Sequence, residues 1–372
     1  MLNSSFKLGR LAGVEIGINM SLLLVAGLLW LSLSTQIFPR TVAGQSEPVY
    51  YLLGGAVSIL FFGSVLWHEM AHALAARFFG IPVRQIVLNL IGGLAVMEEE
   101  AKTPTQEFWI SFSGPLSSAV LGGMCWFSAQ TLGTQTLMGA ALLWLGQINL
   151  ILAAFNMIPG FPLDGGRVFE AVIWFFSRNQ LLAVRVSSTV GQIFAALFVL
   201  FAGFELMRTG SIFGSAWTLF IGWFLWTAAK YHRLNATKRA ALKGVFVGQA
   251  IRSHTPIDYD WPLIYAMDRM AIGGHIRTAL VTSEDKIIGL FALESLRHIP
   301  RLSWGSVRVG QVMQPIVNFP RVSHDEEIFD VLRRMEQRDA DYVVVTHEAE
   351  PIAILERLEL LHFAEKLARR PI

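Results

Sequence analysis

The sequence contains few charged residues and almost no cysteine. Only 16% of its 372 residues are charged and 53% are hydrophobic, with a mean hydropathy of +0.48. This balance excludes a soluble globular protein of average composition. The single cysteine, Cys125, excludes an intrachain disulfide. The formal charge of +2, without Lys- or Arg-rich blocks interleaved with aromatic residues, argues against nucleic-acid binding.

Long uncharged runs are confined to the first part of the chain. Each has about the 20 residues needed to cross about 30 Å of hydrocarbon. We expect six spans, at 16–38, 50–79, 108–131, 137–158, 186–206 and 211–229. The charge density becomes ordinary after about residue 231. The sequence therefore predicts a polytopic α-helical membrane domain at 1–230, a linker at 231–244 and a soluble domain at 245–372.

Basic residues are unevenly distributed between the loops. They precede the first span, follow the second and fourth, and cluster after the sixth, whereas the opposite loops contain only Arg40 and Arg208. The positive-inside rule then places both termini and the soluble domain in the cytoplasm.

The stretch Leu66–Phe79, LWHEMAHALAARFF, places His68, Glu69 and His72 inside a nearly apolar span. Positions four apart share one helical face, so both imidazoles can bind one metal ion. Glu69 can reach a water on that ion, which is the physical content of H-E-x-x-H in zinc hydrolases. His68 precedes Arg77 by nine residues, which puts it about 13 Å below the cytoplasmic surface. Ionisable groups at this depth are costly and indicate a functional site.

A third metal ligand is expected because catalytic zinc usually has three protein ligands and one open position. The stretch 156–167, NMIPGFPLDGGR, closes the fourth span, and its prolines and glycines interrupt the helix. Asp164 can turn inward there, at a depth comparable to His68, although a turn-capping aspartate is the alternative. Asn156 either forms an interhelical hydrogen bond or donates to the substrate, and Asn149 fits the first of these roles.

One segment between the second and third spans and another that opens the third span suggest local structure. Residues 83–100, VRQIVLNLIGGLAVMEEE, predict two short strands around a turn at Gly92–Gly93. This membrane-associated hairpin is either a surface feature without a role or an edge strand that binds an extended substrate. The small residues of 111–115, SFSGP, predict close helix packing.

Together, HEMAH, FSGP and NMIPGFPLDGGR resemble the site-2 proteases, zinc metalloproteases that cleave substrates within or near transmembrane helices. The resemblance covers the six spans. It implies that His68, His72 and Asp164 bind one catalytic Zn²⁺, that Glu69 is the general base, and that Asn156 assists the substrate. It also implies transmembrane protein substrates, in the lipid bilayer of a prokaryotic plasma membrane. No segment is long enough for the PDZ domain that many members contain.

The C-terminal part repeats itself. VFVGQAI at 245–251 matches VRVGQVM at 307–313, at an offset of 62. We expect two repeats, at about 245–300 and 307–366, each with a short strand, a helix, two strands and a closing helix. They resemble a pair of CBS domains, which usually dock together and often bind adenine nucleotides. Both repeats lack the hydroxyl and the aspartate typical of nucleotide binding, which argues against that role and leaves homodimerisation or gating.

Two other functions fit part of the pattern. A zinc-binding membrane transporter or sensor with a CBS tail would also contain polar residues in its spans, but it would not require Glu69 between the ligands. An inactive scaffold of protease ancestry ranks last, because every expected catalytic residue is present.

Overall fold

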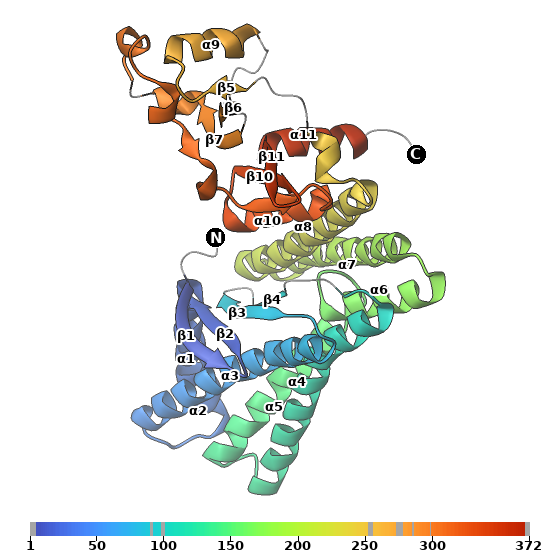
Figure 1. The fold of residues 1–372 in the computed structure, drawn as a ribbon. Helices are drawn as coiled ribbons and strands as arrows, with labels where there is room; N and C mark the ends of the chain where they lie inside the picture. The colour runs from blue at the N-terminus through green and yellow to red at the C-terminus, as the bar shows by residue number, and fades with distance from the viewer. Residues whose placement is uncertain are drawn as a thin grey trace. The chain divides into compact units, whose positions relative to one another are not determined.

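The computed structural model describes residues 5–89, 92–97, 101–251, 256–272, 278–284, 286–297 and 299–368 (Figure 1). The chain divides into two compact units, Met1–Leu234 (unit 1) and Asn235–Ile372 (unit 2). Unit 1 is mainly helical, and unit 2 combines short strands with helices.

Long helices form most of unit 1, and α4 packs against α3, α5 and α6. Side-chain oxygens of Thr103, Thr136 and Asn179 accept hydrogen bonds from the first turns of α4, α5 and α7, which fixes where these helices begin. The helices are α1 Met20–Ser32, α2 Phe38–Thr41, α3 Glu47–Phe78, α4 Pro104–Leu132, α5 Leu137–Asn156, α6 Asp164–Ser177, α7 Gln180–Thr209 and α8 Ile212–Leu242, with a π-helical segment at Leu33–Ile37.

Among the described residues, four helical segments have the length and apolar composition needed to cross a membrane. These are Met20–Thr41, α3, α5 and α7. The spans predicted at 108–131 and 211–229 lie in α4 and α8, outside these four. The predicted start of the first span at residue 16 is wrong, because 16–19 belong to a strand. Helix α6 was not predicted, because its 14 residues are too few for a span.

A four-stranded sheet packs beside α3, in the order β1-β2-β3-β4. Its strands are β1 Ser5–Leu11, β2 Val14–Asn19, β3 Val83–Asn89 and β4 Gly92–Met97. β2 and β3 are parallel, and the other two pairs are antiparallel. The predicted hairpin is therefore present, but Gly92 pairs with Asn89, so Gly92–Gly93 begin β4 instead of forming the turn. Residues 90–91 and 98–100 lie outside the described residues.

Two contacts fix this sheet against α3. Val14 and Ile86 of the sheet are fully buried in a core that includes Ala73 of α3. Burying such a side chain stabilises the fold by about 1.5–3 kcal/mol. At the end of α3, the Arg77 guanidinium donates to the carbonyl of Ala12, in the turn between β1 and β2. Edge strand β4 is thus held beside the helix that contains HEMAH.

Unit 2 contains two similar arrangements of strands. The first sheet has the order β5-β6-β7-β8 and the second β11-β10-β9. Each contains one parallel pair and a neighbouring antiparallel pair, β5–β6 with β6–β7 and β9–β10 with β10–β11, and the first sheet adds a second antiparallel pair, β7–β8. The elements are β5 Ile257–Asp258, α9 Leu263–Ile272, β6 Thr278–Ser283, β7 Lys286–Ala292, β8 Gln314–Pro315, β9 Arg321–Ser323, α10 Ile328–Arg338, β10 Tyr342–His347, β11 Glu350–Glu356 and α11 Arg357–Ala368. Where the first repeat was expected to close with a helix, the structure has a 3₁₀ turn at Leu293–Leu296.

The repeated VxVGQ segments are exchanged between the two arrangements. Val247, from the first copy, donates its N–H to the carbonyl of Glu326 at 2.9 Å and belongs to the core of the second sheet. Val309, from the second copy, donates to Trp261 at 2.9 Å and belongs to the core of the first sheet. The predicted repeat bounds therefore follow the sequence repeat and not the packing. The expected linker at 231–244 is helical as far as Leu242.

Candidate active site

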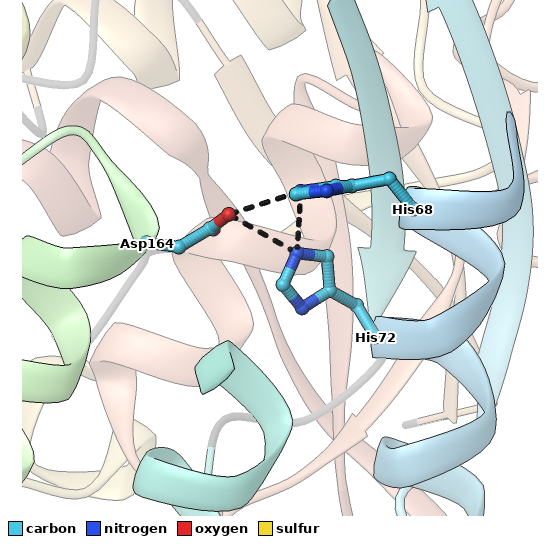
Figure 2. A group of neighbouring side chains, drawn as sticks. All are labelled: His68, His72 and Asp164. Atoms are coloured by element: carbon cyan, nitrogen blue, oxygen red, sulfur yellow. Dashed lines mark hydrogen bonds and ion pairs between the residues drawn. The ribbon is translucent and has the colours of Figure 1, made fainter. Parts of the chain in front are cut away.

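Helix α3 presents His68 and His72 on one face, and both side chains are buried. The two Nε2 atoms are 3.2 Å apart. Figure 2 shows the two imidazoles and the carboxylate of Asp164 converging on one point. Oδ2 of Asp164 lies 3.0 Å from Nε2 of His68 and 3.3 Å from Nε2 of His72. The structure thus brings together three of the residues that the sequence singled out.

Asp164 reaches this point because the chain leaves α5 and begins a new helix. Proline cannot continue a helix, and Pro159 and Pro162 follow the last residue of α5. Asp164 is the first residue of α6, where a carboxylate interacts favourably with the helix N-terminus. The buried hydroxyl of Ser187 donates to the carbonyl of Gly166 at 2.7 Å and ties the start of α6 to α7.

Helix α4 orients both imidazoles. Nδ1 of His72 lies 2.6 Å from the carbonyl oxygen of Ile110, which only accepts, so this nitrogen carries the hydrogen. Nδ1 of His68 lies 2.9 Å from Oγ of Ser118, which is fully buried. A serine hydroxyl can accept as well as donate, so the His68 ring can also carry its hydrogen on Nδ1, and in that tautomer both Nε2 lone pairs face Asp164. This is the tautomer and orientation that metal-binding histidines require.

Gly114 provides the space for these imidazoles. A Cβ atom at this position of α4 would lie 2.2 Å from Nε2 of His72 and 2.7 Å from Nε2 of His68. Any side chain would displace at least one imidazole. The FSGP stretch therefore lines the site itself, in addition to the close packing predicted for it.

Glu69 faces edge strand β4. A Cβ atom at Gly93 would lie 2.1 Å from Cγ and 2.8 Å from Oε1 of Glu69. The edge strand therefore passes directly over the carboxylate that follows the first histidine.

Comparisons with known proteins place this chain in a family. The profile of peptidase family M50 matches residues 56–141 and 132–201. The chain is also 31% identical over 370 residues to sll0528 of Synechocystis sp., whose name describes a zinc metalloprotease, and the match covers 97% of this chain and 95% of that relative. The chain belongs to peptidase family M50. It is therefore a zinc-dependent metalloprotease and a membrane protein.

Two solved structures are similar to parts of this M50 peptidase. The site-2 protease from Methanocaldococcus jannaschii matches 62% of this chain and 95% of its own, with 24% identity and a TM-score of 0.41. A CBS domain, NE2398, matches 32% of this chain and 97% of its own, with 19% identity and a TM-score of 0.28.

The three converging atoms fit the zinc ion of an M50 peptidase. Donors about 2.0–2.1 Å from a tetrahedral zinc lie about 3.3 Å apart, close to the separations of 3.0, 3.2 and 3.3 Å seen here. In the tautomer with both Nδ1 atoms protonated, two imidazole lone pairs and one carboxylate oxygen face one another at these distances, and a cation between them stabilises that arrangement. Two nitrogens and one oxygen are also ligands that zinc prefers.

The two asparagines that the sequence of the M50 peptidase singled out both belong to α5. Asn156 is the last residue of α5 and is partly buried. Asn149 is buried, but it donates to the carbonyl of Leu145 in its own helix at 2.9 Å, instead of forming the predicted interhelical bond.

Sequence reasoning missed the contributions of Ile110, Ser118 and Gly114. A carbonyl leaves no trace in the sequence, and a serine in an apolar helix usually bonds to its own backbone. Gly114 did give a signal, because it lies in a stretch of small residues that opens the helix after HEMAH.

Proposed function

We propose that this peptidase hydrolyses peptide bonds in or near the transmembrane helices of membrane-protein substrates, with one zinc ion held by His68, His72 and Asp164. One observation carries the proposal, namely the convergence of these three ligand atoms to 3.0–3.3 Å. Two of them belong to α3, a helix long enough to cross a membrane, and the third to the first residue of α6. Transmembrane substrates would reach such a site from within the bilayer.

The chemistry requires a base beside the metal. When bound, zinc polarises a water molecule and lowers the pKa of that water to about 7. Glu69 follows the first ligand directly, and we assign its carboxylate to take the proton from the attacking water and return it to the leaving amide nitrogen. The amide of Asn156 would donate to the substrate carbonyl, as the family resemblance implies.

The sheet supplies a surface for the substrate. A helical substrate hides its carbonyl groups in hydrogen bonds, so it must unwind locally before it is cut. Among the described residues β4 is the last strand of its sheet, and its outer edge can bind the unwound segment by backbone hydrogen bonds. Because Gly93 lies against Glu69, a segment added to this edge would pass close to the base.

The predicted topology gives the site a location. Both termini would lie in the cytoplasm of a prokaryotic cell, with the protein in its plasma membrane, and the zinc would lie on the cytoplasmic side of the bilayer centre. Unit 2 would be a pair of CBS domains that supports homodimerisation or gating. Its two similar sheets, with exchanged VxVGQ segments, support this assignment.

The direct test is cleavage of a co-expressed membrane substrate. Glu69→Gln should bind zinc and fail to cut, because only the base is lost. Asp164→Asn should lose both zinc and cleavage. Glu47→Gln is the matched control, since Glu47 is an exposed residue of the first turn of the same helix. If Glu69→Gln and Asp164→Asn cut at the wild-type rate, the assignment is wrong.

A further inference from the structure

His232 of α8 contacts a buried carboxylate and an aromatic ring at once. Its Nε2 donates to Oε2 of Glu170 in α6 at 3.0 Å, and the Glu170 side chain is only 6% exposed. Its imidazole lies flat on the ring of Phe161, with the centroids 3.8 Å apart and the planes 3° from parallel. One side chain thus connects α8 both to α6 and to the loop between α5 and α6.

This loop determines where Asp164 lies. Phe161 precedes Asp164 by three residues, and two prolines keep the segment from continuing α5. Turn hydrogen bonds of Gly160 to Ile158 and of Leu163 to Gly160 shape this loop locally. Side-chain contacts such as that of Phe161 then fix it against the neighbouring helices. A metal site requires its ligands within about 0.5 Å of the productive geometry. The stacking of His232 on Phe161 restricts the loop and thereby the position of Asp164.

The same loop is also connected to α4. The Arg167 guanidinium of α6 lies 5.9 Å from the centroid of the Phe161 ring and 3.6 Å from Oε1 of Glu107 in α4. Helix α4 orients His68 and His72 through Ser118 and Ile110. The contacts around Phe161 therefore connect the element that carries Asp164 with the element that orients the two histidines.

We propose that His232 is a positioning residue of the zinc site: fixed by Glu170 and stacked on Phe161, it holds the loop that presents Asp164. The inference rests on the proposed function, in which Asp164 is a zinc ligand.

The test measures the zinc affinity of the purified full-length protein by competition with a chelator. His232→Ala and Phe161→Leu should each weaken zinc binding by about 10–100-fold, as the loss of an orienting contact does in other zinc sites. Phe161→Tyr retains the stacked ring and should bind zinc like the wild type. Tyr231→Ala is the matched control, because Tyr231 precedes His232 on α8 and is 60% exposed. The loss of zinc-binding free energy in the double variant should be smaller than the sum of the losses in the two single variants, because both single variants remove the same stacking contact.

The zinc-free melting temperature and the zinc affinity together separate positioning from a general loss of structure. The zinc-free melting temperature of Phe161→Leu should stay near that of the wild type while its zinc affinity falls. If His232→Ala fails to fold because Glu170 is left buried and unpaired, Phe161→Leu decides the question. Wild-type zinc affinity in Phe161→Leu, or an equal loss in Phe161→Tyr, would overturn the proposal. Asp164→Asn tests the proposed function separately, because wild-type zinc affinity in that variant would remove Asp164 as a ligand.

Discussion

Replacing Gly114 with alanine places a methyl group where the ligand nitrogens lie. The new Cβ would be 2.2 Å from Nε2 of His72, whereas ordinary contacts between such atoms are about 3.5 Å. The imidazole must therefore retreat by about 1 Å, a displacement that typically costs about 100-fold in rate. The fold itself should survive, because an imidazole can swing aside and alanine favours a helix interior over glycine by about 0.5–1 kcal/mol.

The assay combines cleavage of a reconstituted single-span substrate with zinc affinity and zinc-free melting temperature. Gly114→Ala should lose about 100-fold in cleavage rate and bind zinc more weakly, with an unchanged or higher melting temperature. Gly123→Ala is the matched control, because it lies on the same helix and its Cβ would meet nothing within 4 Å. If Gly114→Ala cuts at the wild-type rate with normal zinc affinity, the zinc does not lie where these imidazoles converge.

Three other changes test neighbouring parts of the structure. Ser118→Ala removes the hydrogen-bond partner of the His68 ring and should weaken zinc binding by about 10–100-fold, as measured by chelator competition. Ser117→Ala should leave zinc binding unchanged, because the Ser117 hydroxyl donates to the carbonyl of Gly114 in its own helix. Gly93→Ala should displace the Glu69 carboxylate and lower kcat by about 100-fold while the zinc content stays normal. Equal losses of zinc and kcat would argue against Glu69 as a base that does not bind the metal. Val247→Ala should destabilise unit 2 by about 0.5–3 kcal/mol and increase hydrogen exchange in β9 to β11 more than in β5 to β7, and the reverse pattern would contradict the exchanged packing.

The sequence singled out the three residues that converge in the structure, whereas it predicted only part of the fold around them. The spacing of His68 and His72 is a local property of one helix, and the prolines before Asp164 interrupt a helix wherever they occur. These local patterns therefore indicated candidate metal ligands without knowledge of the tertiary structure. The sequence also indicated the hairpin at 83–97, through its β-branched residues.

The parts that were missed depend on contacts between distant segments. The pairing of β2 with β3 joins residues about 70 positions apart, which no local pattern specifies. The stretch Val14–Asn19 does alternate apolar with polar or small residues as a strand does, but it is short and runs directly into the apolar residues of α1. Helix α6 is amphipathic and too short to be recognised as a span. The exchange of the VxVGQ segments is a property of packing, since a sequence repeat does not determine which copy a segment contacts.

X-ray absorption at the zinc edge, on the purified full-length protein, tests the central claim most directly. The proposed site predicts about one zinc per chain, with two imidazole nitrogens and carboxylate or water oxygens at about 2.0–2.1 Å and no sulfur. His68→Ala, His72→Ala and Asp164→Ala should each lose this zinc. A full complement of zinc with an unchanged spectrum in these variants would show that the metal is held elsewhere.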